Sequence, residues 1–275
     1  MADDREAYLE ANRALWDELV DIHMSSAFYD LEGFKEGRCR LSALEKREVG
    51  DVRGKRLLHL LCHFGLDSLS WARLGADVTG VDFSERAVHA ARSLSEESRL
   101  PARFVCCEAL ESARHIRESF DLVFMSWGVF CWISDLDALA RMIAGFLKPG
   151  GFFYAIDGHP AILALDESWT PERGRLSLIR DYELGQTPIG YEWGPDYADP
   201  DKRPHNDTAY EWAHGLGRII TGLCRAGLKI DFLHEHEAAC WQVLKGMRRG
   251  DDGFWAMPEG HGQIPASFSL KASKP

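Results

Sequence analysis

Short apolar runs alternate with amphipathic segments along most of the chain, and this alternation predicts a sheet flanked by helices. Runs of mostly apolar residues that are too short for a helix are typical of buried strands. Such strands are predicted over residues 56–61, 76–81, 102–106, 120–125, 152–156, 228–235 and 266–271. Apolar residues at helical spacing predict helices over residues 3–22, 41–49, 66–74, 85–98, 136–147 and 208–226, with a turn over residues 148–151. This order indicates an α/β protein.

The stretch from residue 55 to residue 84 combines a strand, a tight turn, a helix and a second strand. Residues 62–65 form the turn, and Asp82 stands at the carboxyl end of the second strand. A helix that begins after such a turn offers unpaired backbone N–H groups to an anion, and an acid in the position of Asp82 accepts hydrogen bonds from ribose hydroxyls. The unit predicts either a site for a ligand with a ribose and an acidic tail, or a purely structural βαβ unit.

Five motifs follow one another between residues 57 and 156, and they read LLHLLCHFG, VTGVDFS, FVCCEAL, FDLVFMSWGVFCW and LKPGGFFY. In this order they resemble the class I S-adenosylmethionine-dependent methyltransferases, especially bacterial members that act on small molecules. The resemblance implies a Rossmann-like, seven-stranded, mostly parallel sheet with an antiparallel last strand and helices on both faces. It also implies S-adenosylmethionine as the cofactor and S-adenosylhomocysteine as the product.

The resemblance places the cofactor against the turn, the end of the second strand and the loops that follow the next strands. The implied cofactor-binding residues are Trp16, Cys62, His63, Gly65, Asp82, Phe83, Glu108, Ala109, Leu110, Ser126 and Trp127. Trp16 is alternatively a core residue that docks the N-terminal arm, and Glu108 is alternatively a solvated residue at a helix start.

The first motif departs from the acid-x-Gly-x-Gly-x-Gly pattern of the family. His59, Leu61 and His63 occupy the positions of the acid and the first two glycines, and only Gly65 remains. His63 is expected either to offer a ring N–H to the cofactor carboxylate or to point outward. Asp67 or a residue of the N-terminal arm is the candidate partner of the cofactor ammonium.

The domain organisation follows from the positions of the irregular segments. Residues 1–50 are predicted to be an N-terminal helical arm or lid, and residues 51–275 the methyltransferase domain. Aromatic cap insertions are expected at residues 160–207 and 237–265. Because the resemblance makes the last strand antiparallel, both insertions begin on the cofactor face, where they and the arm would enclose a substrate chamber.

Five residues near this chamber are predicted to contact the substrate: His23, Tyr29, Phe130, His159 and Tyr191. His159 follows the fifth strand and is the candidate catalytic base, because an imidazole titrates near neutral pH. Alternatively it is a hydrogen-bonding residue without a catalytic role. Trp127 and Phe130 are alternatively core residues, and Trp132 is predicted to pack in the core.

Composition narrows the class of partner. The chain has 275 residues, 45% of them hydrophobic, and a formal net charge of −11, which disfavours nucleic acid as a partner. The N-terminus is charged and no segment is long enough to span a bilayer, so a cytoplasmic protein without membrane partners is expected. The seven cysteines lack paired zinc-ligand spacing, and no metal is predicted. The oligomeric state stays open.

The function expected is transfer of a methyl group to an N, O or S atom of a small-molecule acceptor. Two alternatives bind the same cofactor: a noncatalytic S-adenosylmethionine-binding module, and an enzyme that uses the cofactor for non-methyl chemistry. A nicotinamide-dependent oxidoreductase is disfavoured, because the turn CHFGLD lacks the G-x-G-x-x-G pattern.

Overall fold

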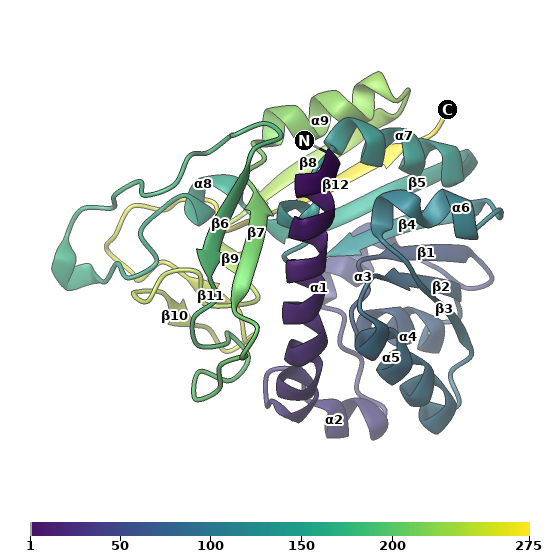
Figure 1. The fold of residues 1–275 in the computed structure, drawn as a ribbon, viewed down its shortest axis with the longest axis horizontal. Coiled ribbons are helices and arrows are strands. Elements are labelled where there is room, and N and C mark those ends of the chain that lie inside the picture. Colours follow the sequence, from purple (N-terminus) through teal and green to yellow (C-terminus); the bar gives the residue numbers. More distant parts are fainter. Residues whose placement is uncertain (1) are drawn as a thin grey trace.

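A seven-stranded sheet forms the centre of the protein in the computed structural model, which describes residues 2–275 (Figure 1). Its strand order is β3-β2-β1-β4-β5-β12-β8. The strands are β1 (Arg56–Leu60), β2 (Asp77–Asp82), β3 (Ala102–Cys106), β4 (Phe120–Ser126), β5 (Leu147–Gly158), β8 (Lys229–His236) and β12 (Ser267–Ser273). The pairs among β1 to β5 are parallel, whereas β12 is antiparallel to both β5 and β8. The predicted fold class is therefore confirmed.

The sheet is buried on both faces, which explains the continuous apolar runs of its strands. Neighbouring residues of one strand point to opposite faces. Leu58 and Val123 accordingly belong to one buried cluster, and Leu57 and Phe124 belong to another on the opposite face. A strand with apolar residues at every position is stable only between two such layers.

The helices form those layers. The longer ones are α1 (Ala2–Ser25), α4 (Leu66–Arg73), α5 (Glu85–Ser98), α7 (Leu136–Phe146) and α9 (Leu216–Arg225). Short helical segments are α2 (Leu31–Lys35), α3 (Ala43–Val49), α6 (Ser112–His115), α8 (Pro160–Leu163), η1 (Ala109–Glu111), η2 (Phe130–Trp132) and η3 (Pro171–Arg173). Within the described residues, none of the helices combines the length and apolar character needed to cross a membrane.

Two smaller sheets lie outside the central one. A hairpin pairs β6 (Pro188–Glu192) with β7 (Thr208–Trp212). The second small sheet contains β9 (Ala238–Ala239), β10 (Arg248–Arg249) and β11 (Trp255–Ala256). Figure 1 shows both on the same side of the molecule, next to α8 and across α1 from strands β1 to β3.

Two local predictions were wrong. The helix predicted over residues 208–226 begins only at Leu216, because residues 208–212 pair with β6 and Gly215 occupies the N-cap position. Thr, Tyr and Trp in this segment favour a strand when a partner is present. The turn predicted over residues 148–151 lies inside β5, where the register with β4 shifts as Phe120 pairs with Leu147 and Leu122 with Phe152.

Helix α1 connects the central sheet to the outer hairpin. The Asn12 side chain, only 1% exposed, both donates to the Tyr210 carbonyl and accepts from the Tyr210 N–H, each at 2.8 Å. On the other side, Asp17 accepts from the Ser84 hydroxyl at 2.5 Å, and Ser84 is the N-cap of α5. These contacts hold α1 across the carboxyl edge of the sheet (Figure 1).

We expect Asn12→Ala to destabilise the protein by about 1–3 kcal/mol, because the backbone groups of Tyr210 lose their partner at a buried position. Denaturant unfolding measures the free energy of unfolding. Asn206→Ala is the matched control, since the Asn206 side chain is exposed and bonds only Glu18 of α1. An equal loss in both variants would argue against the structural role of Asn12.

Candidate functional site

The turn between β1 and α4 adopts the conformation of a glycine-rich loop although it retains one glycine. Leu61, His63 and Gly65 have φ values of 56°, 50° and 82°, all in the left-handed region. This conformation costs a residue with a side chain about 1–2 kcal/mol. A Cβ atom at Gly65 would lie 2.9 Å from the Phe104 ring, so only glycine fits there. The turn therefore keeps the left-handed backbone conformation at Leu61 and His63, the two positions where the family pattern has glycine.

Asp82 lies beside this turn at the end of β2, and its side chain is fixed by backbone donors. It accepts from the His63 N–H at 2.7 Å through Oδ2 and from the Ser84 N–H at 3.0 Å through Oδ1. Burial raises the pKa of Asp82, and these hydrogen bonds lower it. The effect of burial is larger, and the pKa is about 6. At neutral pH the carboxylate is ionised and has lone pairs left for further donors.

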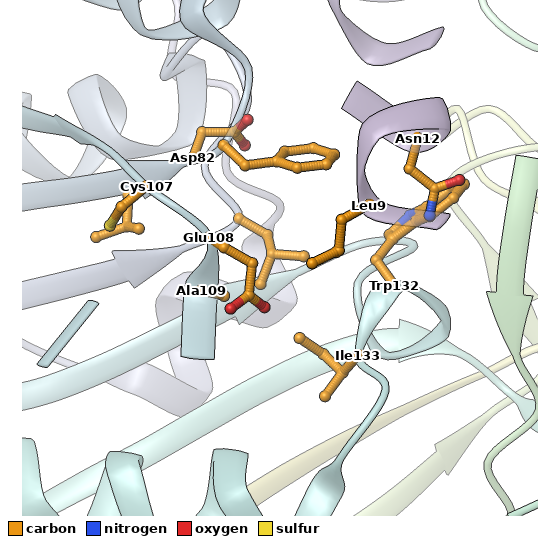
Figure 2. A pocket seen from close by; sticks show the side chains of 11 residues that line it. Leu9, Asn12, Asp82, Cys107, Glu108, Ala109, Trp132 and Ile133 are labelled. Carbon is orange, nitrogen blue, oxygen red and sulfur yellow. The ribbon is translucent and has the colours of Figure 1, made fainter. Parts of the chain in front are cut away.

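A pocket opens between Asp82 and α1. Its walls come from α1, from the ends of β1, β2 and β3, and from η2 with the residue after it; they are Leu9, Asn12, Leu61, Val81, Asp82, Phe83, Cys107, Glu108, Ala109, Trp132 and Ile133. In Figure 2, Leu9 and Asn12 of α1 face Asp82 and Glu108 across the pocket. Flat apolar walls with a carboxylate at one end suit a nucleoside, whose base is apolar on its faces and whose ribose donates hydrogen bonds.

The pocket contains four of the predicted cofactor residues: Asp82, Phe83, Glu108 and Ala109. Burial raises the pKa of Glu108, which forms an ion pair with Arg5 of α1 at 3.4 Å. Leu110, by contrast, packs against the main hydrophobic core and is not among the lining residues.

Several lining residues were missed by the sequence analysis. Leu9, Asn12 and Trp16 recur at helical spacing on α1, and this spacing is the signal that could have placed Leu9 and Asn12 beside the site. Trp132 packs against the buried cluster that includes Leu15 and Leu19, as predicted, and it also lines the pocket, with its ring 5.3 Å from that of Trp16.

The other predicted cofactor residues lie around the turn and the end of β4. Cys62 is buried under the turn, and its N–H donates to the Val81 carbonyl. Ser126, the last residue of β4, donates its hydroxyl to Asp67 Oδ2 at 3.0 Å. Trp127 follows with φ 49°, and its ring lies 6.0 Å from Trp241 and 6.1 Å from Phe254.

A single carboxylate fixes the loop after β4. Asp157 of β5 accepts from the backbone N–H groups of Gly128, Val129, Phe130 and Gly158 at 2.5 to 3.0 Å. These bonds hold the loop that follows Trp127 against the end of β5.

A pair of buried acids lies next to this loop. Burial and the nearby Asp67 raise the pKa of Glu45 to about 8, and burial also raises the pKa of Asp67. Glu45 Oε1 has no hydrogen-bond partner. The raised pKa values favour the neutral acids in the free protein, and a cation bound beside them would favour the ionised forms.

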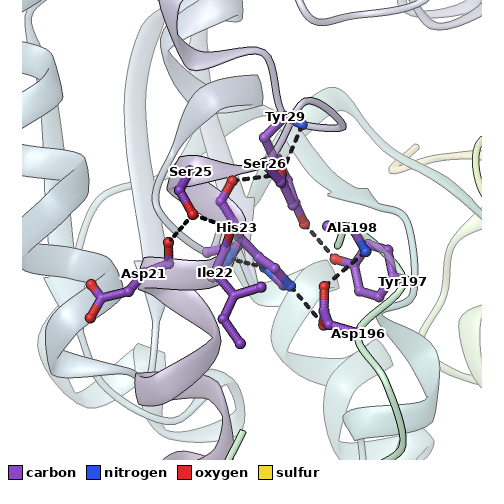
Figure 3. A network of polar contacts seen from close by, with 10 residues as sticks. Asp21, Ile22, His23, Ser25, Ser26, Tyr29, Asp196, Tyr197 and Ala198 are labelled. Atoms are coloured by element: carbon purple, nitrogen blue, oxygen red, sulfur yellow. Dashed lines mark hydrogen bonds and ion pairs between the residues drawn. The ribbon is translucent and has the colours of Figure 1, made fainter. Parts of the chain in front are cut away.

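The predicted substrate residues His23 and Tyr29 belong to one buried network, shown in Figure 3. His23 lies 2.8 Å from His63 and 3.2 Å from Asp196, and its ring stacks on Tyr29 at 4.9 Å. The Tyr29 hydroxyl bonds that of Tyr197. This network joins α1 and the residues after it to the turn after β1 and to the segment between β6 and β7.

The remaining predicted substrate residues lie apart from this network. Phe130 is 6% exposed and stacks on Phe268, so in this conformation it is a core residue. The Tyr191 hydroxyl donates to Glu211 at 2.6 Å, and burial raises the pKa of Glu211.

His159 has a partner at each ring nitrogen. Nδ1 accepts from the Ala161 N–H at 3.1 Å, so Nε2 carries the proton that it donates to Glu235 at 2.9 Å. Burial lowers the pKa of His159. A role as catalytic base stays a prediction, and it requires that the bond from Ala161 opens first.

Comparison with known proteins identifies the chemistry of this fold. Residues 58–155 match the family described as "Methyltransferase domain". The ubiquinone biosynthesis O-methyltransferase of Rhodopseudomonas palustris (strain HaA2) is 25% identical over 189 residues, which are 68% of this chain and 67% of that protein.

Two solved structures are similar in fold. One is a putative S-adenosylmethionine-dependent methyltransferase from Listeria monocytogenes, with a TM-score of 0.60, 20% identity, and 84% of this chain and 94% of that chain covered. The other is the glycopeptide N-methyltransferase MtfA in complex with S-adenosylmethionine, with a TM-score of 0.54, 16% identity, and 91% and 95% covered.

The methyltransferase domain at residues 58–155 and the named relatives support an enzyme that transfers a methyl group from S-adenosylmethionine, built on the central sheet of order β3-β2-β1-β4-β5-β12-β8. The residues present fit this cofactor: the pocket offers apolar walls and Asp82 to an adenosine, and the Glu45–Asp67 pair offers buried acids to an ammonium. Within residues 2–275, no group of three His, Cys, Asp or Glu side chains could hold a metal ion.

We expect Asp82→Asn to weaken binding of S-adenosylhomocysteine by about tenfold or more, since one acceptor oxygen is replaced by an amide that meets the N–H of His63 or Ser84. Isothermal titration calorimetry measures the affinity. Asp77→Asn, at the exposed start of the same strand, is the matched control. Unchanged affinity in Asp82→Asn would remove this residue from the site.

The affinity for 5′-methylthioadenosine, which lacks the amino-acid tail, should fall as the pH is lowered from 7 to 5. The reason is that Asp82, with a pKa of about 6, becomes protonated and loses its acceptor capacity. At pH 5, one unit below that pKa, only about one tenth of the molecules have an ionised Asp82, so the affinity should be about tenfold lower. In Asp82→Asn this loss should be absent, and its persistence there would assign the pH dependence to another group.

Proposed function

We propose that the protein methylates an oxygen atom of a small-molecule acceptor. The cofactor supplies an activated methyl group on a sulfonium, so the protein mainly has to align the acceptor and exclude water. The observation that carries the proposal is the adenosine-like pocket, which α1 covers at the carboxyl edge of the sheet. The name of the R. palustris relative supports an oxygen as the accepting atom.

The acceptor is proposed to lie beside the end of β4, on the side away from the adenosine pocket. The ring of Trp127, the residue directly after β4, lies there near the rings of Trp241 and Phe254, which both come from the second insertion. Aromatic faces of this kind pack against a ring or a cation. Asp157 supports the position by fixing the loop that follows Trp127.

Enclosure supports a small acceptor. The arm at residues 1–50 and the insertions at residues 160–207 and 237–265 are proposed to act as the lid and the caps of a domain that comprises residues 51–275. A macromolecular acceptor would need an open edge, whereas α1 is bonded to α5 through Asp17 and to β7 through Asn12. The net charge of −11 further disfavours nucleic acid.

The state of the cysteines is consistent with a reducing compartment. All seven are free thiols, and disulfides are rare in the cytoplasm but common in secreted proteins. We therefore infer a cytoplasmic location for the reaction.

The test is methyl transfer from S-adenosylmethionine labelled in its methyl group. The protein is incubated with cell extract that has been separated into small-molecule, protein and nucleic-acid fractions. Label is expected in the small-molecule fraction, in a product that mass spectrometry shows to carry the methyl group on oxygen. Label in the protein or nucleic-acid fraction would contradict the proposal.

Asp82→Asn and Asp77→Asn serve as paired controls in the same assay. Transfer should fall in the first variant in proportion to its loss of cofactor affinity, and it should be unchanged in the second. If wild-type protein binds the cofactor but transfers label to none of the fractions, a noncatalytic binding module becomes the better description.

A further inference from the structure

His63 combines two features that its neighbours in the turn do not share. Its backbone N–H binds Asp82, the residue that faces the ribose end of the pocket, while its ring extends toward α1 and contacts Trp16 at 5.2 Å. Its ring atom Nδ1 is buried and has no hydrogen-bond partner. A buried polar atom without a partner costs about 1–3 kcal/mol, which a ligand that supplies the partner would recover.

The proton positions in the network follow from the donors and acceptors available. Asp196 as a carboxylate can only accept, so Nε2 of His23 carries a proton. If His23 is neutral, its Nδ1 accepts from Nε2 of His63 across 2.8 Å, and Nδ1 of His63 is left with a bare lone pair. In this state the two rings carry two N–H protons in total. Nδ1 of His63 becomes an N–H donor only after a third proton has bound to the rings.

The surroundings of the network disfavour a charge on His63 in the free protein. Burial and the adjacent His23 hold the pKa of His63 well below its usual value. The ionisable groups that face the two rings are Asp82 at the His63 amide, Asp196 at His23, and the hydroxyls of Tyr29 and Tyr197. No Lys or Arg side chain is among the described hydrogen-bonding or ring contacts of His63 and His23.

We propose that the Asp196–His23–His63 network is the binding site for the α-carboxylate of the cofactor, and that it takes up a proton from solvent to bind it. The carboxylate accepts only, so Nδ1 of His63 must carry a hydrogen, which requires the third proton on the rings. Asp196 stabilises the positive charge through His23. No covalent bond changes, and the proton returns to solvent when the product leaves.

The position of His63 in the chain favours a cofactor group over the methyl acceptor as the partner. Its amide already touches the acid at the ribose end of the pocket, and the amino-acid tail of the cofactor begins at the ribose. The second charge of that tail, its ammonium, suits the acidic pair Glu45 and Asp67, since Asp67 lies on the first turn of the helix that follows His63. The proposal rests on S-adenosylmethionine as the cofactor but not on the identity of the acceptor.

The experiment compares two ligands at several pH values by isothermal titration calorimetry. S-adenosylhomocysteine has the carboxylate, and 5′-methylthioadenosine lacks the whole amino-acid tail. As the pH rises from 6.5 to 8.5, the affinity of wild-type protein for S-adenosylhomocysteine should decrease. The decrease should approach tenfold per pH unit at pH values where the two rings of the free protein carry only two protons and must take up a third. The affinity for 5′-methylthioadenosine should stay nearly constant over this range.

The key variant is His63→Asn, because asparagine tolerates the left-handed conformation of the turn and carries no titratable ring. We expect its affinity for S-adenosylhomocysteine at pH 6.5 to fall by at least tenfold, and its affinity for 5′-methylthioadenosine to change by less than threefold. When this variant binds S-adenosylhomocysteine, it should take up fewer protons than the wild type does, by up to one. Its affinity should therefore change less with pH. The ligand amine, Glu45 and Asp67 titrate in both proteins, so this difference isolates the network.

His23→Gln is a second test at the other ring, and His89→Gln, an exposed position on α5, is the matched control for removing a histidine. His23→Gln should reduce the pH dependence for S-adenosylhomocysteine in the same way, while His89→Gln should match the wild type. Circular dichroism verifies that each variant is folded.

The same pH dependence in wild type, His63→Asn and His23→Gln would overturn the proposal. So would an equal loss of affinity for both ligands in His63→Asn, because that result indicates a damaged pocket rather than a lost carboxylate partner. Failure of folded wild-type protein to bind either ligand would instead reject the cofactor-binding function itself, so the two failures are distinguishable.

Discussion

The hydrogen bond from the His63 amide to Asp82 ties the turn after β1 to the end of β2, and the arrangement of the site depends on it. The turn can make this bond only because Leu61 and His63 adopt left-handed backbone conformations, which side chains disfavour. Packing of Gly65 against Phe104 holds the rest of the turn in place. The surrounding sheet thus stabilises a left-handed backbone path at residues with side chains, and at position 63 that side chain is the titratable ring of a histidine.

Helix α1 converts this edge of the sheet into an enclosed site. It contributes Leu9 and Asn12 to the pocket wall and reaches the central domain and the outer hairpin through Asp17 and Asn12. One helix thus serves both as a wall of the pocket and as the connection between the central sheet and the outer hairpin.

Protons balance part of the charge in the site, while Arg5 pairs with Glu108. The two acids Glu45 and Asp67 have raised pKa values, while burial lowers that of His63. These shifts favour the neutral forms of the groups until a charged ligand binds, which avoids the cost of burying an unpaired ion. A cofactor with both an ammonium and a carboxylate on its tail matches this distribution of acidic and basic groups.

The sequence by itself determined the sheet and the residues that directly follow its strands. Asp82, Phe83, Glu108 and Ala109 reach one pocket because parallel strands bring their carboxyl ends to a common edge, so local spacing is sufficient to place them. Only the tertiary structure decided that residues 208–212 form a strand and that Asp196 joins His23, a contact across 173 positions of the chain. The segments that form these contacts have no regular spacing of apolar residues that would predict their structure. Their conformation is selected by the contacts with the segments they pack against, not by their own sequence.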